Sequence, residues 1–163
     1  MALLFAWQFL GMALKLQLGR ESALASFFVG SHGSVGLLLF VLVLLRGAWG
    51  LSQWSRRPRH GGGWLGRAAA MGHGALYLLM LVVPALALVR AYGSGRGFVW
   101  FNLVPLLAPG PRDDALMAPA RLLHGPLAWT LLALIAGHVL MVVVHRWWWR
   151  DDVAGRMVGR VPR

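Results

Sequence analysis

The strongest constraint on this chain is a set of long apolar blocks that contain almost no charged side chain. Three of them, 22–45, 68–89 and 122–144, reach the roughly 20 residues that a helix needs to cross a bilayer. Their apolar residues run continuously rather than along one helical face, so lipid is the expected solvent. Over the chain 13% of residues are charged, whereas soluble domains carry about 25%.

A fourth apolar block opens the chain and is shorter than the others. Residues 1–14 precede Lys15 and would span about 21 Å as a helix, less than the hydrocarbon core of about 30 Å. Snorkelling of Lys15 would extend this span to residue 18. We therefore predict an all-α fold, an integral membrane four-helix bundle that forms a single domain over 1–163. The predicted spans are approximately 1–18, 24–45, 68–89 and 122–146.

The distribution of arginine predicts the orientation of these spans. The segments 46–67 and 145–163 carry five arginines each, whereas 90–121 carries four, partly offset by Asp113 and Asp114. Cytoplasmic loops are the ones enriched in Lys and Arg, so both termini are expected in the cytoplasm. Because the arginines lie between apolar blocks, the net charge of +11 indicates membrane lipid, and not nucleic acid, as the partner.

The composition also limits the chemistry that the chain can perform. It has no cysteine, which excludes disulfides, thiolate zinc sites, iron–sulfur clusters and thioether-linked haem. None of its five acidic residues lies inside an apolar block, which disfavours a proton relay of the kind found in pumps. Metal chemistry would therefore rest on the six histidines.

Two of the histidines share a face of the last span. His124 and His138 are 14 residues apart, so on a helix they lie within about 40° of one another and about 21 Å apart along the axis. His32 lies near the same end of its own span as His124, so these two can approach one cofactor from opposite sides. Zinc would need three or four clustered ligands, so haem is favoured. Glycines such as Gly36 would admit a flat macrocycle, although they also serve close helix packing.

Three segments carry a recognisable order of residues. They are His32-Gly-Ser-Val-Gly36 with apolar residues up to Arg46, Gly72-His73-Gly-Ala-Leu-Tyr77 through Pro84 to Tyr92, and His124, His138 and His145 followed by Arg150-Asp151 and Arg156-Met157. In this order and spacing they resemble the bacterial cytochrome b561 family, which is grouped with the cytochrome b subunits of nickel hydrogenases. The resemblance covers nearly the whole chain.

The resemblance implies two b haems held by four histidines from the first, second and fourth helices. Carried over by position, His32 and His124 would bind the outer haem and His138 would be one ligand of the inner haem. His73 matches a recurrent histidine that is not normally a ligand; it would support a haem propionate or be an ordinary interfacial residue. Gly36 and Arg46 belong to the matched motifs and are expected in cofactor binding.

The chain departs from the family in its first helix. The family places its remaining ligand in a His-Trp pair at the start of that helix, whereas no histidine precedes His32 here. We therefore expect that the numbering starts at an internal methionine and that the missing ligand lies upstream. An in-frame stop codon just before Met1 would refute this expectation.

The resemblance also implies the function. We expect a multi-pass protein of the bacterial inner membrane that exchanges electrons between the quinone pool and a periplasmic donor or acceptor, with superoxide oxidation coupled to ubiquinone reduction as one form. The alternative is a haem-bearing membrane anchor of a periplasmic dehydrogenase or hydrogenase. A haem-free transporter or scaffold is the third class, and an optical spectrum distinguishes it.

Overall fold

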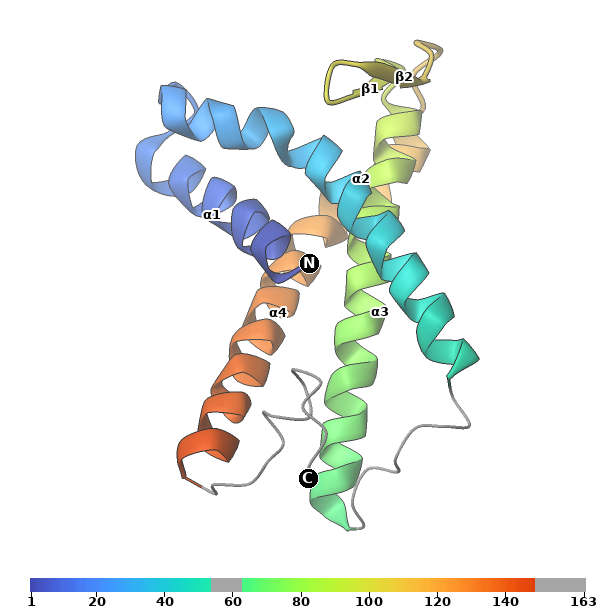
Figure 1. The fold of residues 1–163 in the computed structure, drawn as a ribbon. Coiled ribbons are helices and arrows are strands. Elements are labelled where there is room, and N and C mark those ends of the chain that lie inside the picture. The colour runs from blue at the N-terminus through green and yellow to red at the C-terminus, as the bar shows by residue number, and fades with distance from the viewer. Residues whose placement is uncertain (54–62, 149–163) are drawn as a thin grey trace.

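The computed structural model describes residues 1–53 and 63–148, apart from the side chain of Leu65. Residues 149–163 of the predicted basic tail and residues 54–62 of the arginine-rich segment 46–67 lie outside the described residues. Within them the chain forms four helices and one two-stranded sheet (Figure 1). These are α1 (Ala2–Leu18), α2 (Ala23–Ser52), α3 (Trp64–Gly93), β1 (Phe98–Trp100), β2 (Val104–Leu107) and α4 (Asp114–Trp147).

The helices have the length and surface of membrane helices. By length and composition α2, α3 and α4 can each cross a membrane, and α1 is an apolar helix of 17 residues. Large apolar side chains point outward from them: Phe27 is 64% exposed, Leu78 60% and Leu140 61%. Such a surface is compatible with lipid, which is as apolar as these side chains. The prediction of a multi-pass helical membrane protein is therefore confirmed, while the number of spans and their orientation stay predictions.

The helices pack in sequential pairs. α1 lies along α2, α2 crosses α3, and α3 lies along α4 (Figure 1). We call the end that carries β1 and β2 the hairpin end, and the opposite end, where α2 and α4 finish, the distal end. α1 begins at mid-height and runs toward the hairpin end (Figure 1). Gly11 allows its close approach to α2, because a Cβ there would lie 2.7 Å from the Cβ of Phe28.

The segment 91–120, which joins the predicted spans 68–89 and 122–146, contains regular structure of its own. α3 continues to Gly93, and α4 already begins at Asp114. Between them β1 and β2 form an antiparallel hairpin whose turn is closed by the N–H of Leu103, which donates to the oxygen of Trp100 at 2.9 Å. This hairpin is the one departure from an all-α chain in the residues that the structure covers.

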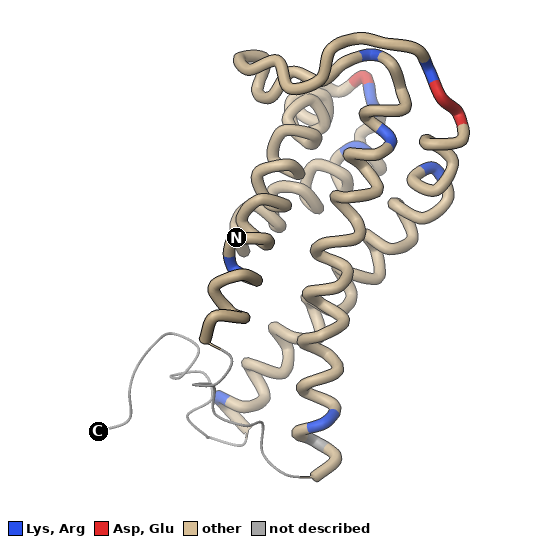
Figure 2. Tube along the Cα trace, turned by 90° about the vertical axis from the view of Figure 1, so that its right-hand side faces the viewer, with Lys and Arg blue, Asp and Glu red and all other residues tan. Residues whose placement is uncertain are grey.

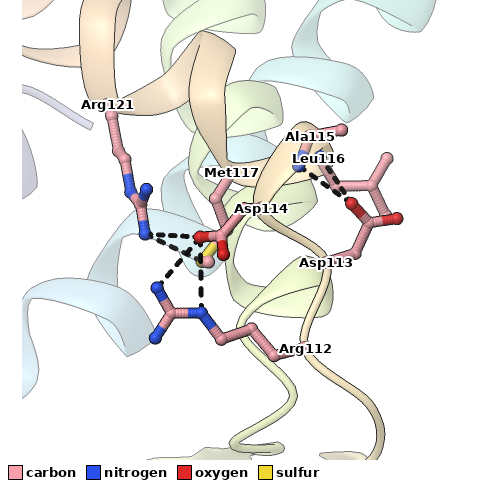
Figure 3. Close-up of polar contacts among 7 residues, drawn as sticks. All are labelled: Arg112, Asp113, Asp114, Ala115, Leu116, Met117 and Arg121. Carbon is pink, nitrogen blue, oxygen red and sulfur yellow. Dashed lines mark hydrogen bonds and ion pairs between the residues drawn. The ribbon is translucent and has the colours of Figure 1, made fainter.

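Short polar contacts fix the start of α4 (Figure 3). Asp113 Oδ1 accepts hydrogen bonds from the backbone N–H groups of Ala115 and Leu116, which caps the helix. Asp114 pairs with Arg112 at 2.9 Å and with Arg121 at 3.0 Å. The hydrogen bond to Asp114 raises the pKa of Arg112. All three charged side chains are exposed, so solvent screens each pair and its contribution to stability is small.

Candidate functional site

The structure brings His32 of α2 and His124 of α4 together near the hairpin end. Both are half-buried, their ring centroids lie 6.3 Å apart, and their planes differ by 72°. Metal–imidazole bonds are about 2.0–2.1 Å long, and each nitrogen lies about 1.1 Å from its ring centre, so two rings on opposite sides of one metal have centroids roughly 6.3 Å apart. The observed spacing fits two ligands on opposite sides of one iron.

A backbone carbonyl of α3 orients one of these rings. His124 Nδ1 lies 3.0 Å from the oxygen of Val83, a buried residue that precedes Pro84. In the tautomer with hydrogen on Nδ1, the ring donates to this carbonyl and the lone pair of Nε2 is free for a metal. Metal-binding histidines commonly have such a partner, which fixes the ring and raises its basicity.

The two rings line a cavity of about 180 Å³ to which all four helices and β1 contribute. Its polar side chains are Gln8, His32, His124 and the indole of Trp129, and the remaining lining is apolar. An apolar cavity with a few convergent polar groups is the usual form of a cofactor site. Together with the ring spacing, this lining fits the b haem that the sequence analysis expects.

The glycines beside His32 lie close to side chains of other elements, so space for a macrocycle is not their sole role. A Cβ at Gly33 would lie 3.2 Å from Phe98 Cε2, and one at Gly36 would lie 3.2 Å from Gln8 Nε2. Gly36 does line the cavity, but it also makes room for the amide of Gln8. A Cβ at Gly125, next to His124, would meet no atom within 4 Å.

The hairpin covers the cavity at its end of the molecule. Trp100 Nε1 donates to the oxygen of Ser34 at 3.0 Å, and the N–H of Phe101 donates to Ser34 Oγ at 2.8 Å. Ser34 is 6% exposed. These bonds hold Phe101 and Asn102 at φ values of 47° and 58°, which side chains other than glycine rarely adopt. Phe98 of β1 thereby lines the cavity and shields it from water.

A second pair of histidines lies toward the distal end. The rings of His73 on α3 and His138 on α4 have centroids 5.3 Å apart and planes that differ by 66°. This spacing is about 1 Å shorter than two ligands across one iron require. This contact cannot be read from the sequence alone, because the rotation of each helix about its axis depends on packing.

Two further polar groups lie near this second pair. Arg46 Nε donates to the hydroxyl of Tyr77 at 3.1 Å, which joins α2 to α3. Tyr77 and His73 are four residues apart and therefore share a face of α3. Among residues 1–53 and 63–148, His, Cys, Asp and Glu side chains do not gather in groups of three or more that could hold a metal ion.

Comparisons with known proteins identify the family of this chain. The family model described as prokaryotic cytochrome b561 matches residues 1–160. The chain is 31% identical over 134 residues to cytochrome b561 homolog 2 of Escherichia coli (strain K12), a match that covers 79% of this chain and 69% of that protein. The chain thus belongs to the prokaryotic cytochrome b561 family, whose members are transmembrane, b-type haem proteins of electron transport.

Proposed function

We propose that the protein carries electrons through a bacterial inner membrane by means of a b haem held between His32 and His124. The observation that most strongly supports this proposal is the 6.3 Å separation of the two ring centroids across an apolar cavity. When bound, b haem supplies a one-electron couple, and two imidazole ligands leave no coordination position open for oxygen.

The residues around the pair position and shield the site rather than react. His32 and His124 come from different helices, so their mutual distance depends on the packing of α2, α3 and α4. The carbonyl of Val83 holds His124 in one tautomer. Phe98 and the docked hairpin exclude water from one side. No catalytic acid or base is needed for electron transfer, and none is proposed.

We also propose that His138 binds a second haem toward the distal end. It lies 14 residues after His124 on the same helix, a rise of about 21 Å, so two cofactors would lie at different depths in the membrane. The cation of Arg46, with its bond to Tyr77, offers a site for a carboxylate such as a haem propionate. His73, beside His138, is proposed as a supporting residue of this site.

The proposed orientation places the distal end and the C-terminus in the cytoplasm, and α1 starts at mid-height and runs away from that side (Figure 1). Among the described residues, the acidic ones lie at the hairpin end together with several cationic ones (Figure 2). Support for this orientation comes from the full sequence, in which segments 46–67 and 145–163 carry five arginines each and 90–121 carries four, an excess that favours a cytoplasmic distal end. A periplasmic redox partner would then meet the hairpin end, and a quinone such as ubiquinone would be the partner within lipid. Arg112 and Arg121 are already paired with Asp114, which weakens their attraction for a free anion such as superoxide.

The optical spectrum of the purified chain, with haem counted per chain, tests the principal proposal. We expect the sharp reduced α band of low-spin b haem, and we expect His32→Ala and His124→Ala each to remove one haem per chain. The control is His145→Ala, which changes a histidine of α4 outside both ring pairs and should keep the full haem content. Full haem content in both His32→Ala and His124→Ala would overturn the proposal.

A further inference from the structure

Gln8 is the polar residue in the otherwise apolar stretch 2–14 of α1, and it lines the same cavity as His32. Its Nε2 donates to the backbone oxygen of His32 at 3.0 Å. Its Oε1 is buried and accepts no hydrogen bond from the residues that the structure describes. A buried acceptor without a donor costs free energy, and such an atom needs an explanation.

Among the described residues, the ring of His32 lacks a hydrogen-bond acceptor, just as Gln8 Oε1 lacks a donor. His124 has a carbonyl for its Nδ1, but neither ring nitrogen of His32 forms a hydrogen bond within residues 1–53 and 63–148. A histidine that binds iron through Nε2 carries hydrogen on Nδ1, and that N–H needs an acceptor. The cavity therefore holds one acceptor without a donor and one prospective donor without an acceptor.

We propose that Gln8 is a positioning residue for His32 and accepts a hydrogen bond from His32 Nδ1–H through Oε1 when the haem is bound. This inference rests on the proposed function. The amide is already anchored to the backbone of the same histidine, and both side chains line the same cavity. Gly36 leaves the space that the amide occupies, because a Cβ there would lie 3.2 Å from Nε2.

The proposal has a measurable electronic consequence. An acceptor on Nδ1–H makes the imidazole a stronger donor to iron, which stabilises the ferric state and lowers the midpoint potential. Gln8→Leu removes the acceptor, so the potential of the His32–His124 haem should rise. Gln8→Glu keeps an acceptor oxygen, so the potential should stay at or below that of the unmodified protein.

This pair of variants separates positioning from a purely structural role. Both lack the amide N–H that donates to the oxygen of His32, so loss of that bond alone would move both potentials in the same direction. Gln8→Glu is titrated over a pH series, because an ionised carboxylate would lower the potential by its charge even without a hydrogen bond to His32. Trp7→Phe is the matched control, because Trp7 Nε1 donates to Ser31 Oγ at 2.9 Å between the same two helices and Trp7 does not line the cavity. Its potential should not change. Gly36→Ala should displace Gln8 and raise the potential by less than Gln8→Leu does.

The experiment is a redox titration of the purified full chain, followed at the α band in each variant. Opposite behaviour of Gln8→Leu and Gln8→Glu, with Trp7→Phe unchanged, supports the proposal. Equal shifts in both variants, or no shift in either, overturn it while leaving the His32–His124 haem in place. Failure of the proposed function looks different: the unmodified chain binds no haem, or His32→Ala leaves the haem content and the potentials unchanged.

Discussion

The two histidine pairs of this protein are built differently. At the hairpin end, His32 and His124 lie 6.3 Å apart across a cavity that four helices and β1 line. Toward the distal end, His73 and His138 lie 5.3 Å apart between α3 and α4. α1 starts at mid-height (Figure 1), so it accompanies the first pair. The separation between ring centroids that suits two iron ligands therefore occurs where α1 and the hairpin complete the wall of the site.

We expect the strongest change in haem content from variants of α4 that each lose one haem and keep the other. His124→Ala should remove the haem at the hairpin end and leave the distal one, while His138→Ala should do the reverse, because the two residues lie about 21 Å apart on α4. Haem per chain and the reduced spectrum measure both outcomes. Loss of all haem from a variant that still purifies as a folded protein would show that the two sites are not independent.

His73→Ala tests whether His73 binds iron at the distal end or only supports His138. If His73 supports His138 without binding iron, the variant should keep the distal haem and show a changed spectrum or potential. His73→Gln should restore the spectrum in part, since an amide can replace one hydrogen bond of the ring. Loss of the distal haem as complete as in His138→Ala would instead identify His73 as a ligand.

Ser34→Ala tests the cover over the first pair. It removes the acceptor for the N–H of Phe101, which should cost about 0.5–1.5 kcal/mol because one part-buried hydrogen bond is lost. A loosened hairpin would admit water, which favours ferric iron and lowers the potential of the hairpin-end haem alone. Thermal unfolding and redox titration measure the two effects. Ser52→Ala, which removes an exposed bond to Trp49, is the control and should change neither.

The smallest effects are expected at the start of α4. Asp113→Ala removes the helix cap and should lower stability by about 0.5–2 kcal/mol. Asp114→Asn breaks two exposed ion pairs and should lower stability by less than Asp113→Ala does, and by less again in high salt. Thermal unfolding with and without salt ranks the two variants. A larger loss for Asp114→Asn would contradict the ranking.

Several features of the site could be predicted from sequence because they depend on depth and helical period. The apolar blocks indicated the helices, and the equal depth of His32 and His124 indicated that they could meet. The hairpin could not be predicted, because its turn residues Phe101 and Asn102 hold left-handed conformations through contacts with Ser34, 67 residues away from Phe101 in sequence, rather than through a glycine.

The contacts of Gln8 and of His73 also escaped the sequence analysis. Both depend on how helices rotate and cross, which a single sequence does not specify. One signal did exist for Gln8: an amide within an apolar span is costly in lipid and is usually functional. The partner of His124, the oxygen of Val83, belongs to the backbone and leaves no trace in residue identity.

The most direct test of the account is the electron paramagnetic resonance spectrum of ferric protein in the His138→Ala variant, which should retain only the haem at the hairpin end. Two imidazoles whose planes differ by 72° should give a low-spin signal of large anisotropy. A high-spin signal would mean that the iron lacks one of the two ligands, and it would contradict the binding of a single haem by His32 and His124.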